Sequence, residues 1–127
     1  MIRKLAGISA LLGLITVILG AFGAHSLKEK LDAEALKNFE TGTRYMMYHI
    51  LAILLIVNTG LIKEKSKIII SGFFLAGILF FSGSIFAISL DLVQAKQIWF
   101  VTPLGGLFFI VGWLISALSF FNFSDKN

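Results

Sequence analysis

The sequence has no cysteine, a single proline and few charged residues, which make up 14 % of the chain. The absence of cysteine excludes disulfides and thiolate metal sites. A charged fraction this far below the roughly 25 % of an ordinary soluble domain indicates that lipid rather than water surrounds much of the chain. Hydrophobic residues reach 57 % and the mean hydropathy is +0.92. A soluble domain of 127 residues could not bury so much apolar surface, so the composition predicts a membrane protein.

Enzyme signatures are also missing, because the sequence contains no nucleophile elbow, no phosphate-binding loop and no HExxH pattern. We therefore expect no enzymatic activity and no cofactor. The formal charge of +4 comes from bases at the ends of apolar segments. This placement is typical of topology signals and lipid headgroup contacts, and it does not favour nucleic acid as a partner.

Four apolar segments are long enough to cross a bilayer core, which takes about 20 residues of helix. They cover residues 5–24, 45–62, 68–90 and 103–121. Thr102 and Pro103 suit the first turn of the last segment. The first segment could instead be a signal peptide, but its apolar run is longer than the roughly 7–15 residues of such a core. The pattern predicts one all-α domain, a bundle of four transmembrane helices.

The only long polar connection runs from Leu27 to Arg44, between the first two segments. Asp32 can cap a helix that continues into the second segment. Apolar residues recur along one side of the connection, at Leu27, Leu31, Ala35 and Phe39. This spacing predicts an amphipathic segment that lies on the membrane surface or folds over the mouth of the bundle.

The distribution of basic residues predicts the orientation of the chain. The short connection between the second and third segments carries Lys63, Lys65 and Lys67, whereas the longer opposite loop mixes bases with acids. Short basic flanks stay on the cytoplasmic side. We therefore expect both termini in the cytoplasm, which would place Tyr45 and Tyr48 near the outer interface.

Small residues within the segments predict where helices pack closely, since packing holds helices together in lipid. Gly20 and Ala24 are four residues apart, as are Gly83 and Ala87, and Gly105, Gly106 and Gly112 lie in the last segment. We expect these residues to pack within one chain, with a dimer seam as the alternative. Trp113 is predicted to be a packing wedge whose N–H bonds to a neighbour.

Ionisable and phenolic side chains gather in the stretch FETGTRYMMYH, residues 39–49, and His25 ends the first segment. Residues four apart share a helix face, so Glu40 can pair with Arg44 and Tyr45 lies with His49. We expect a polar cluster at the outer mouth of the first hairpin, made of His25, Glu40, Arg44, Tyr45, Tyr48 and His49.

Three interpretations of this cluster remain open. It can be a hydrogen-bonded network that holds the bundle together, a binding or transport site with a titrating histidine, or a metal or haem site that uses both histidines. The histidines lack short ligand spacing, which disfavours the last. The matching functions are a structural or interaction protein with a lipid, protein or second-copy partner, an oligomeric transporter or channel of small solutes or ions, and a haem or metal carrier.

Four motifs carry a resemblance to a known family. They are GAFGAHSL from Gly20, the FETGTRYMMYH stretch, FFSGS from Phe80 and TPLGGLFFIVGWL from Thr102. Together they resemble the bacterial multi-pass proteins called domain of unknown function 423, to which eukaryotic transmembrane protein 256 is similar. The resemblance implies a four-span protein of the bacterial plasma membrane. It supplies no catalytic residues.

Overall fold

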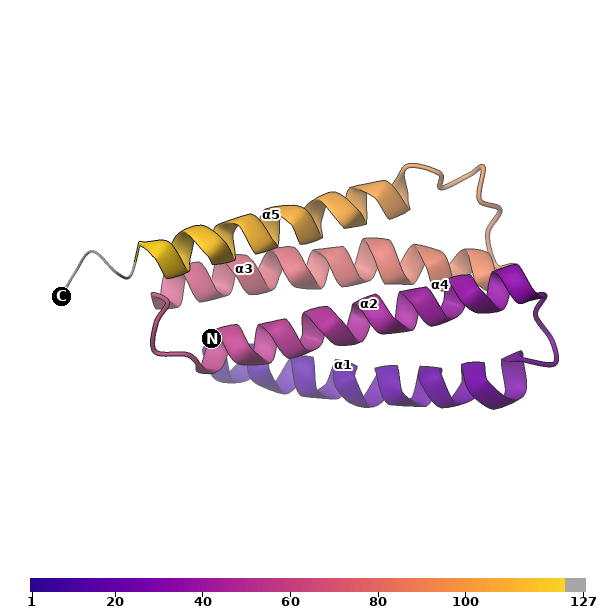
Figure 1. Ribbon diagram of the computed structural model, residues 1–127, viewed down its shortest axis with the longest axis horizontal. Helices are drawn as coiled ribbons and strands as arrows, with labels where there is room; N and C mark the ends of the chain where they lie inside the picture. The colour runs from indigo at the N-terminus through magenta and orange to yellow at the C-terminus, as the bar shows by residue number, and fades with distance from the viewer. Residues whose placement is uncertain (123–127) are drawn as a thin grey trace.

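The computed structural model of the protein describes residues 1–122 and contains only helices, turns and loops in that range. The helical elements form four rods, which pack side by side (Figure 1). The first is α1 (Ile2–Phe22), which ends in a π-helical turn, η1 (Gly23–Leu27). The second is α2 (Ala33–Asn58). The all-α prediction is therefore confirmed for the described residues.

The third rod is built from three consecutive pieces, α3 (Glu64–Gly77), the π-helical turn η2 (Ile78–Ser82) and α4 (Gly83–Ser89). The fourth rod is α5 (Val101–Phe121). The N-terminus and the end of α5 lie at the same end of the bundle (Figure 1). Each rod thus runs antiparallel to the one before it.

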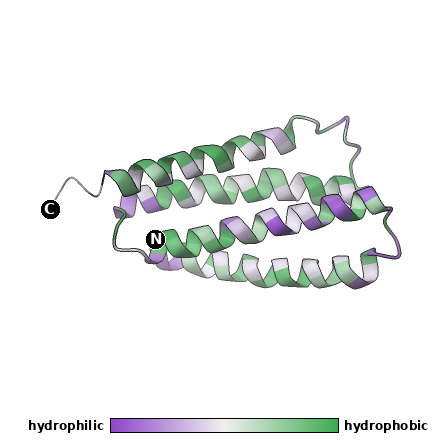
Figure 2. Cartoon of the chain, in the orientation of Figure 1, coloured by the Kyte–Doolittle hydropathy of each residue, from purple (hydrophilic) through white to green (hydrophobic). Residues whose placement is uncertain are grey.

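Three of the rods are long and apolar enough to cross a membrane, namely Ile2–Leu27, Glu64–Ser89 and Val101–Phe121. The second rod, α2, has the length but a mixed character. Figure 2 shows hydrophilic residues along its N-terminal half and hydrophobic ones toward its C-terminal end. In the described structure, three helices therefore meet the length and composition of a membrane span, one fewer than the four predicted from the sequence.

The start of α2 follows the predicted cap, because the backbone N–H of Ala35 donates to Asp32 Oδ1 at 2.8 Å. From there the helix continues to Asn58. The structure does not form a separate helix from the predicted amphipathic segment, because its residues from Ala33 onward belong to the first part of α2, along which Phe39 is buried. The segment predicted at residues 45–62 begins inside α2 and extends past its end.

The core lies around α2, which contacts α1 on one side and α3, η2 and α4 on the other. Ile50 and Ile53 of α2 are fully buried, together with Ile70 and Phe74 of α3. Helix α1 contributes little to this core, since Leu11, Leu14 and other large side chains on it are exposed. An apolar, outward-facing helix is what a lipid environment requires.

Polar side chains also join the rods outside the candidate site. Ser82 Oγ donates to the carbonyl oxygen of Gly42 at 2.7 Å, which ties η2 to α2. Ser84 Oγ lies 2.6 Å from Thr102 Oγ1, which ties α4 to α5. Such hydrogen bonds hold helices together where lipid surrounds them.

Neighbouring helices come into close contact at only some of the small residues predicted to allow it. A Cβ at Gly105 would collide with the backbone of Phe81, and one at Gly112 would lie 2.6 Å from the ring of Phe74. A Cβ at Gly42 would lie 2.8 Å from the ring of Phe86. These glycines let α5 approach the third rod, and let that rod approach α2.

The other predicted packing residues have more room. A Cβ at Gly20 would meet Thr43 at 3.7 Å, and one at Gly106 would meet Phe81 at 4.0 Å. Nothing lies within 4 Å of a Cβ placed at Gly83. Ala24 is exposed and Ala87 is half-buried. A small residue in an apolar helix therefore marks close packing only when it faces a neighbour.

Candidate functional site: an aromatic groove between α2 and α5

The structure divides the predicted polar cluster into separate parts. His25 is exposed at the end of the first rod, where its Nδ1 lies 3.1 Å from the carbonyl oxygen of Ala21. Glu40 and Arg44 line a shallow groove beside α1 and are exposed. His49 instead lies against α5 and is buried. The six groups therefore do not meet at one end of the bundle.

His49 is held by hydrogen bonds at both ring nitrogens. Trp113 Nε1 donates to His49 Nε2 at 3.1 Å, and His49 Nδ1 lies 2.7 Å from the carbonyl oxygen of Tyr45. An indole N–H can only donate, and a carbonyl oxygen can only accept. His49 Nε2 must therefore carry the lone pair and Nδ1 the hydrogen, so the contacts select a neutral ring in one tautomer.

Aromatic rings surround this histidine. Its ring stacks on Phe109 with 3.5 Å between centroids and 9° between planes. Phe74 approaches it edge-on at 5.2 Å. Both phenylalanines lie near the middle of their rods, so His49 also lies near the middle of the bundle. His25, at the end of the first rod, is far from this level.

A groove of about 500 Å³ opens beside His49, between α2 and α5. The buried rings of His49 and Phe109 form its base. The rings at its sides are more open, with Tyr45 40 %, Tyr48 53 % and Trp113 51 % exposed. The groove faces sideways, away from the ends of the rods. Its full lining is Tyr45, Tyr48, His49, Phe81, Gly106, Phe109, Ile110 and Trp113.

The two tyrosines give the groove its only hydroxyl groups. The ring of Tyr45 packs on Phe81, with 4.9 Å between centroids, and lies 6.0 Å from the ring of Tyr48. Within residues 1–122, the side-chain hydrogen bonds include neither tyrosine hydroxyl. The groove therefore combines aromatic surface with two O–H donors that have no partner in this part of the chain.

A metal site is not assembled from the predicted ligands. The described part of the chain contains no group of three or more histidine, cysteine, aspartate or glutamate side chains that could hold a metal ion. Both nitrogens of His49 are already hydrogen-bonded, and His25 lies at another level. His25 and His49 therefore do not lie at one place where they could bind the same metal ion or haem.

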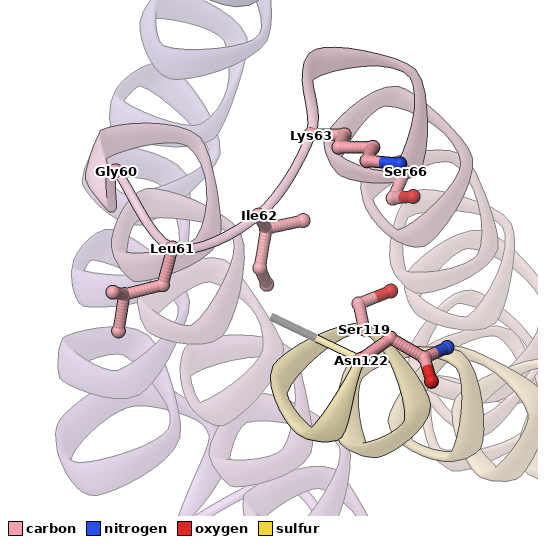
Figure 3. A pocket seen from close by; sticks show the side chains of 7 residues that line it. All are labelled: Gly60, Leu61, Ile62, Lys63, Ser66, Ser119 and Asn122. Atoms are coloured by element: carbon pink, nitrogen blue, oxygen red, sulfur yellow. The ribbon is translucent and has the colours of Figure 1, made fainter. Parts of the chain in front are cut away.

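A second cavity, of about 290 Å³, lies at the end of the bundle where the α2–α3 loop meets the end of α5 (Figure 3). Ser119 and Asn122 extend from α5 on one side, and Lys63 and Ser66 lie on the other. None of the residues predicted from the sequence as site candidates lines it. The groove between α2 and α5, which contains three of them, is the stronger candidate site.

Sequence reasoning did not single out the phenylalanines of the site. Phe81 and Phe109 shape the groove, yet they belong to apolar runs that are rich in phenylalanine. In such runs a ring that faces another helix cannot be told from one that faces lipid. Only the glycine on the opposite rod at each close contact, such as Gly105 against Phe81, offers a signal.

Comparison with known proteins identifies the family. The family described as "Protein of unknown function (DUF423)" matches residues 19–106, which include most of the groove. The chain belongs to the DUF423 family. This DUF423 protein is 36 % identical over 125 residues to a UPF0382 membrane protein of Haemophilus influenzae, an alignment that covers 98 % of each chain.

Two staphylococcal relatives are also UPF0382 membrane proteins. The DUF423 protein is 40 % identical over 120 residues to a UPF0382 membrane protein of Staphylococcus aureus, covering 92 % of this chain and 94 % of the relative. It is 42 % identical over 117 residues to one of Staphylococcus saprophyticus, covering 90 % and 93 %. No solved structure matches the chain. The family and the apolar rods together make this DUF423 chain a membrane protein.

Proposed function

We propose that this protein crosses the bacterial plasma membrane four times and has both termini in the cytoplasm. The proposal adds α2 to the three spans that length and composition identify. With 26 residues, α2 is about 39 Å long at about 1.5 Å per residue, which exceeds the roughly 30 Å of the bilayer core. It lies along the other rods, so it spans the same depth (Figure 1).

The mixed character of α2 is compatible with a span, because protein rather than lipid surrounds much of it. It packs against both α1 and the third rod, and His49 and Gly42 are buried in these contacts. An even number of crossings returns the chain to its starting side. The basic residues Lys63, Lys65 and Lys67 then share the side of the N-terminus, where the positive-inside rule places them.

Cysteine labelling tests this topology directly, because the chain has no cysteine of its own. We expect Lys30→Cys and Lys96→Cys to react with a membrane-impermeant maleimide on intact cells. Lys65→Cys is expected to react only after the cells are opened. All three side chains are exposed at the ends of the bundle. Labelling of Lys30→Cys and Lys65→Cys from the same side would show that α2 does not cross.

We propose that the role of the protein is interaction within the plane of the membrane. The observation that carries this proposal is the position of the groove, which lies beside His49 in the middle of the rods rather than at an end of the bundle, and whose lining includes exposed side chains such as Ile110. The middle of the bundle is instead filled by buried side chains such as Ile53, Ile70 and Phe74. A single chain therefore offers a lateral binding surface, whereas a transporter or channel would need a path formed by several chains.

Photo-crosslinking in native membranes tests the interaction role. A photoreactive residue at Ile110, which lines the groove and is 64 % exposed, is expected to yield a discrete adduct. The matched control is Leu118, on the same helix, 53 % exposed and outside the groove lining. A covalent dimer would identify a second copy as the partner. The same diffuse lipid adducts from both positions would contradict the proposal.

A further inference from the structure

We infer that the groove between α2 and α5 binds a lipid-soluble molecule whose flat ring carries carbonyl oxygens, a molecule of the quinone class. The inference rests on the proposed function, since it requires that the four rods span the bilayer and that the groove is the binding surface. It goes further by naming the chemistry of the ligand.

The two tyrosines lie deep in the bundle. His49 packs against Phe74 and Phe109, which lie near the middle of their rods. Tyr48 precedes His49 in sequence, and Tyr45 lies one turn away, a rise of about 6 Å along the helix. With the four rods spanning the bilayer, we therefore place both phenol groups within the hydrocarbon core, deeper than the outer interface at which the sequence predicts them. Tyrosines in membrane proteins are usually enriched at the interfaces, where water can accept their hydrogen bonds.

The tyrosine hydroxyls lack an acceptor at that depth. Neither tyrosine hydroxyl has a hydrogen-bond partner within residues 1–122. An acyl chain offers no acceptor, and phospholipid ester oxygens lie near the interface, about 15 Å from the midplane of a core of about 30 Å. A main-chain carbonyl of a spanning helix is already bonded within that helix, and it accepts a second hydrogen bond only from a side chain packed directly against it, as the Gly42 carbonyl does from Ser82. A ring with carbonyl oxygens, dissolved in the membrane, supplies what these alternatives lack.

The groove has the size and shape of a small-molecule site. Its volume of about 500 Å³ falls within the roughly 300–1,000 Å³ of small-molecule sites. Gly106 adds no side chain to the lining, and a Cβ there would come no closer than 4.0 Å to Phe81. The side chains around it are mostly aromatic, which suits stacking on a flat ring. The open side would let an apolar tail extend into the lipid.

The chain offers a built-in reporter, because it has only two tryptophans and one of them lines the groove. Trp99→Phe removes the other, which is 73 % exposed before α5. In this background, a short-chain 1,4-benzoquinone added to the protein in phospholipid nanodiscs is expected to quench Trp113 fluorescence saturably. Two compounds that do not quench the fluorescence are then used to displace the quinone. A 1,4-dimethoxybenzene of matched chain length, which keeps two acceptor oxygens, is expected to displace it at least ten times better than an alkylbenzene, which has none.

Variants separate binding in the groove from simple partition into lipid. Gly106→Leu fills the groove and is expected to abolish saturable quenching. Gly72→Leu, at an exposed glycine with nothing within 4 Å of its Cβ, is the matched control and is expected to bind normally. Tyr45→Phe with Tyr48→Phe keeps the rings and removes the donors, so binding is expected to weaken at least fivefold.

Two outcomes would overturn the inference. One is quenching that is linear in quinone and equal in the parent and Gly106→Leu proteins, which indicates partition alone. The other is saturable binding that the double tyrosine variant leaves unchanged, which removes the acceptor argument even if Gly106→Leu fails to fold. A discrete Ile110 adduct alongside either result would retain the proposed interaction role and reject only the ligand class.

Discussion

Gly105→Ala is expected to destabilise the detergent-solubilised protein by roughly 1–3 kcal/mol, the usual cost of overpacking a well-packed contact. The added Cβ would collide with the backbone nitrogen and Cα of Phe81. A backbone cannot rotate away as the end of a side chain can, so α5 must move off the third rod. The measurement is the midpoint of thermal unfolding, with the helical signal as readout.

Gly106→Ala is the matched control for this change, because it alters the next residue of the same helix. Its Cβ would meet only Phe81 Cδ2, at 4.0 Å. Alanine is favoured over glycine inside a helix by roughly 0.5–1 kcal/mol, so this variant is expected to melt at the same temperature as the parent or slightly above it. Equal melting of the two variants would show that α5 does not approach η2 as closely as described.

His49→Leu is expected to cost about 1 kcal/mol of stability, the low end of the penalty for an unpaired polar group, because the Trp113 N–H that loses its acceptor belongs to a half-exposed side chain. The change removes the acceptor of the Trp113 N–H and the ring that stacks on Phe109. A double-mutant cycle with Trp113→Phe isolates the hydrogen bond. In membrane proteins such bonds average about 0.6 kcal/mol and reach about 1.7 kcal/mol, so the coupling energy is expected within that range.

His25→Leu provides the comparison, since His25 is exposed at the end of the first rod. A surface change of this kind is expected to shift stability by no more than about 0.5 kcal/mol. Equal effects at His25 and His49 would contradict the separation of the two histidines. A coupling energy of zero in the His49–Trp113 cycle would contradict the hydrogen bond between them.

The helices were largely predictable because the local chemistry of this chain is strongly patterned. Long apolar runs predict α1, the third rod and α5, and Asp32 predicts the start of α2 because it caps the first turn of that helix. The part of the prediction that was wrong is a separate amphipathic segment between the first two helices, because its residues from Ala33 onward belong to α2. An apolar stripe containing Phe39 suits an interface with lipid and an interface with another helix equally well, and only packing distinguishes them.

The candidate site was predictable only in part. Helical spacing correctly places Tyr45 and His49 on one side of α2, because residues four apart share a face. Spacing along one helix does not reveal which neighbour that face meets. The structure turns it toward α5, where Trp113 and Phe109 complete the site. Glu40 and Arg44 line a different groove, beside α1.

The sequence by itself determined that this chain is a helical membrane protein, because apolar runs of this length must satisfy their own backbone hydrogen bonds where there is no water. It also determined which side chains are polar within those runs. The tertiary structure alone decided that His49 accepts from Trp113 and that two tyrosines open onto a lateral groove. These features depend on how far each helix is rotated and shifted against its neighbours. Rotation and shift are set by contacts between residues distant in sequence, such as Gly105 with Phe81.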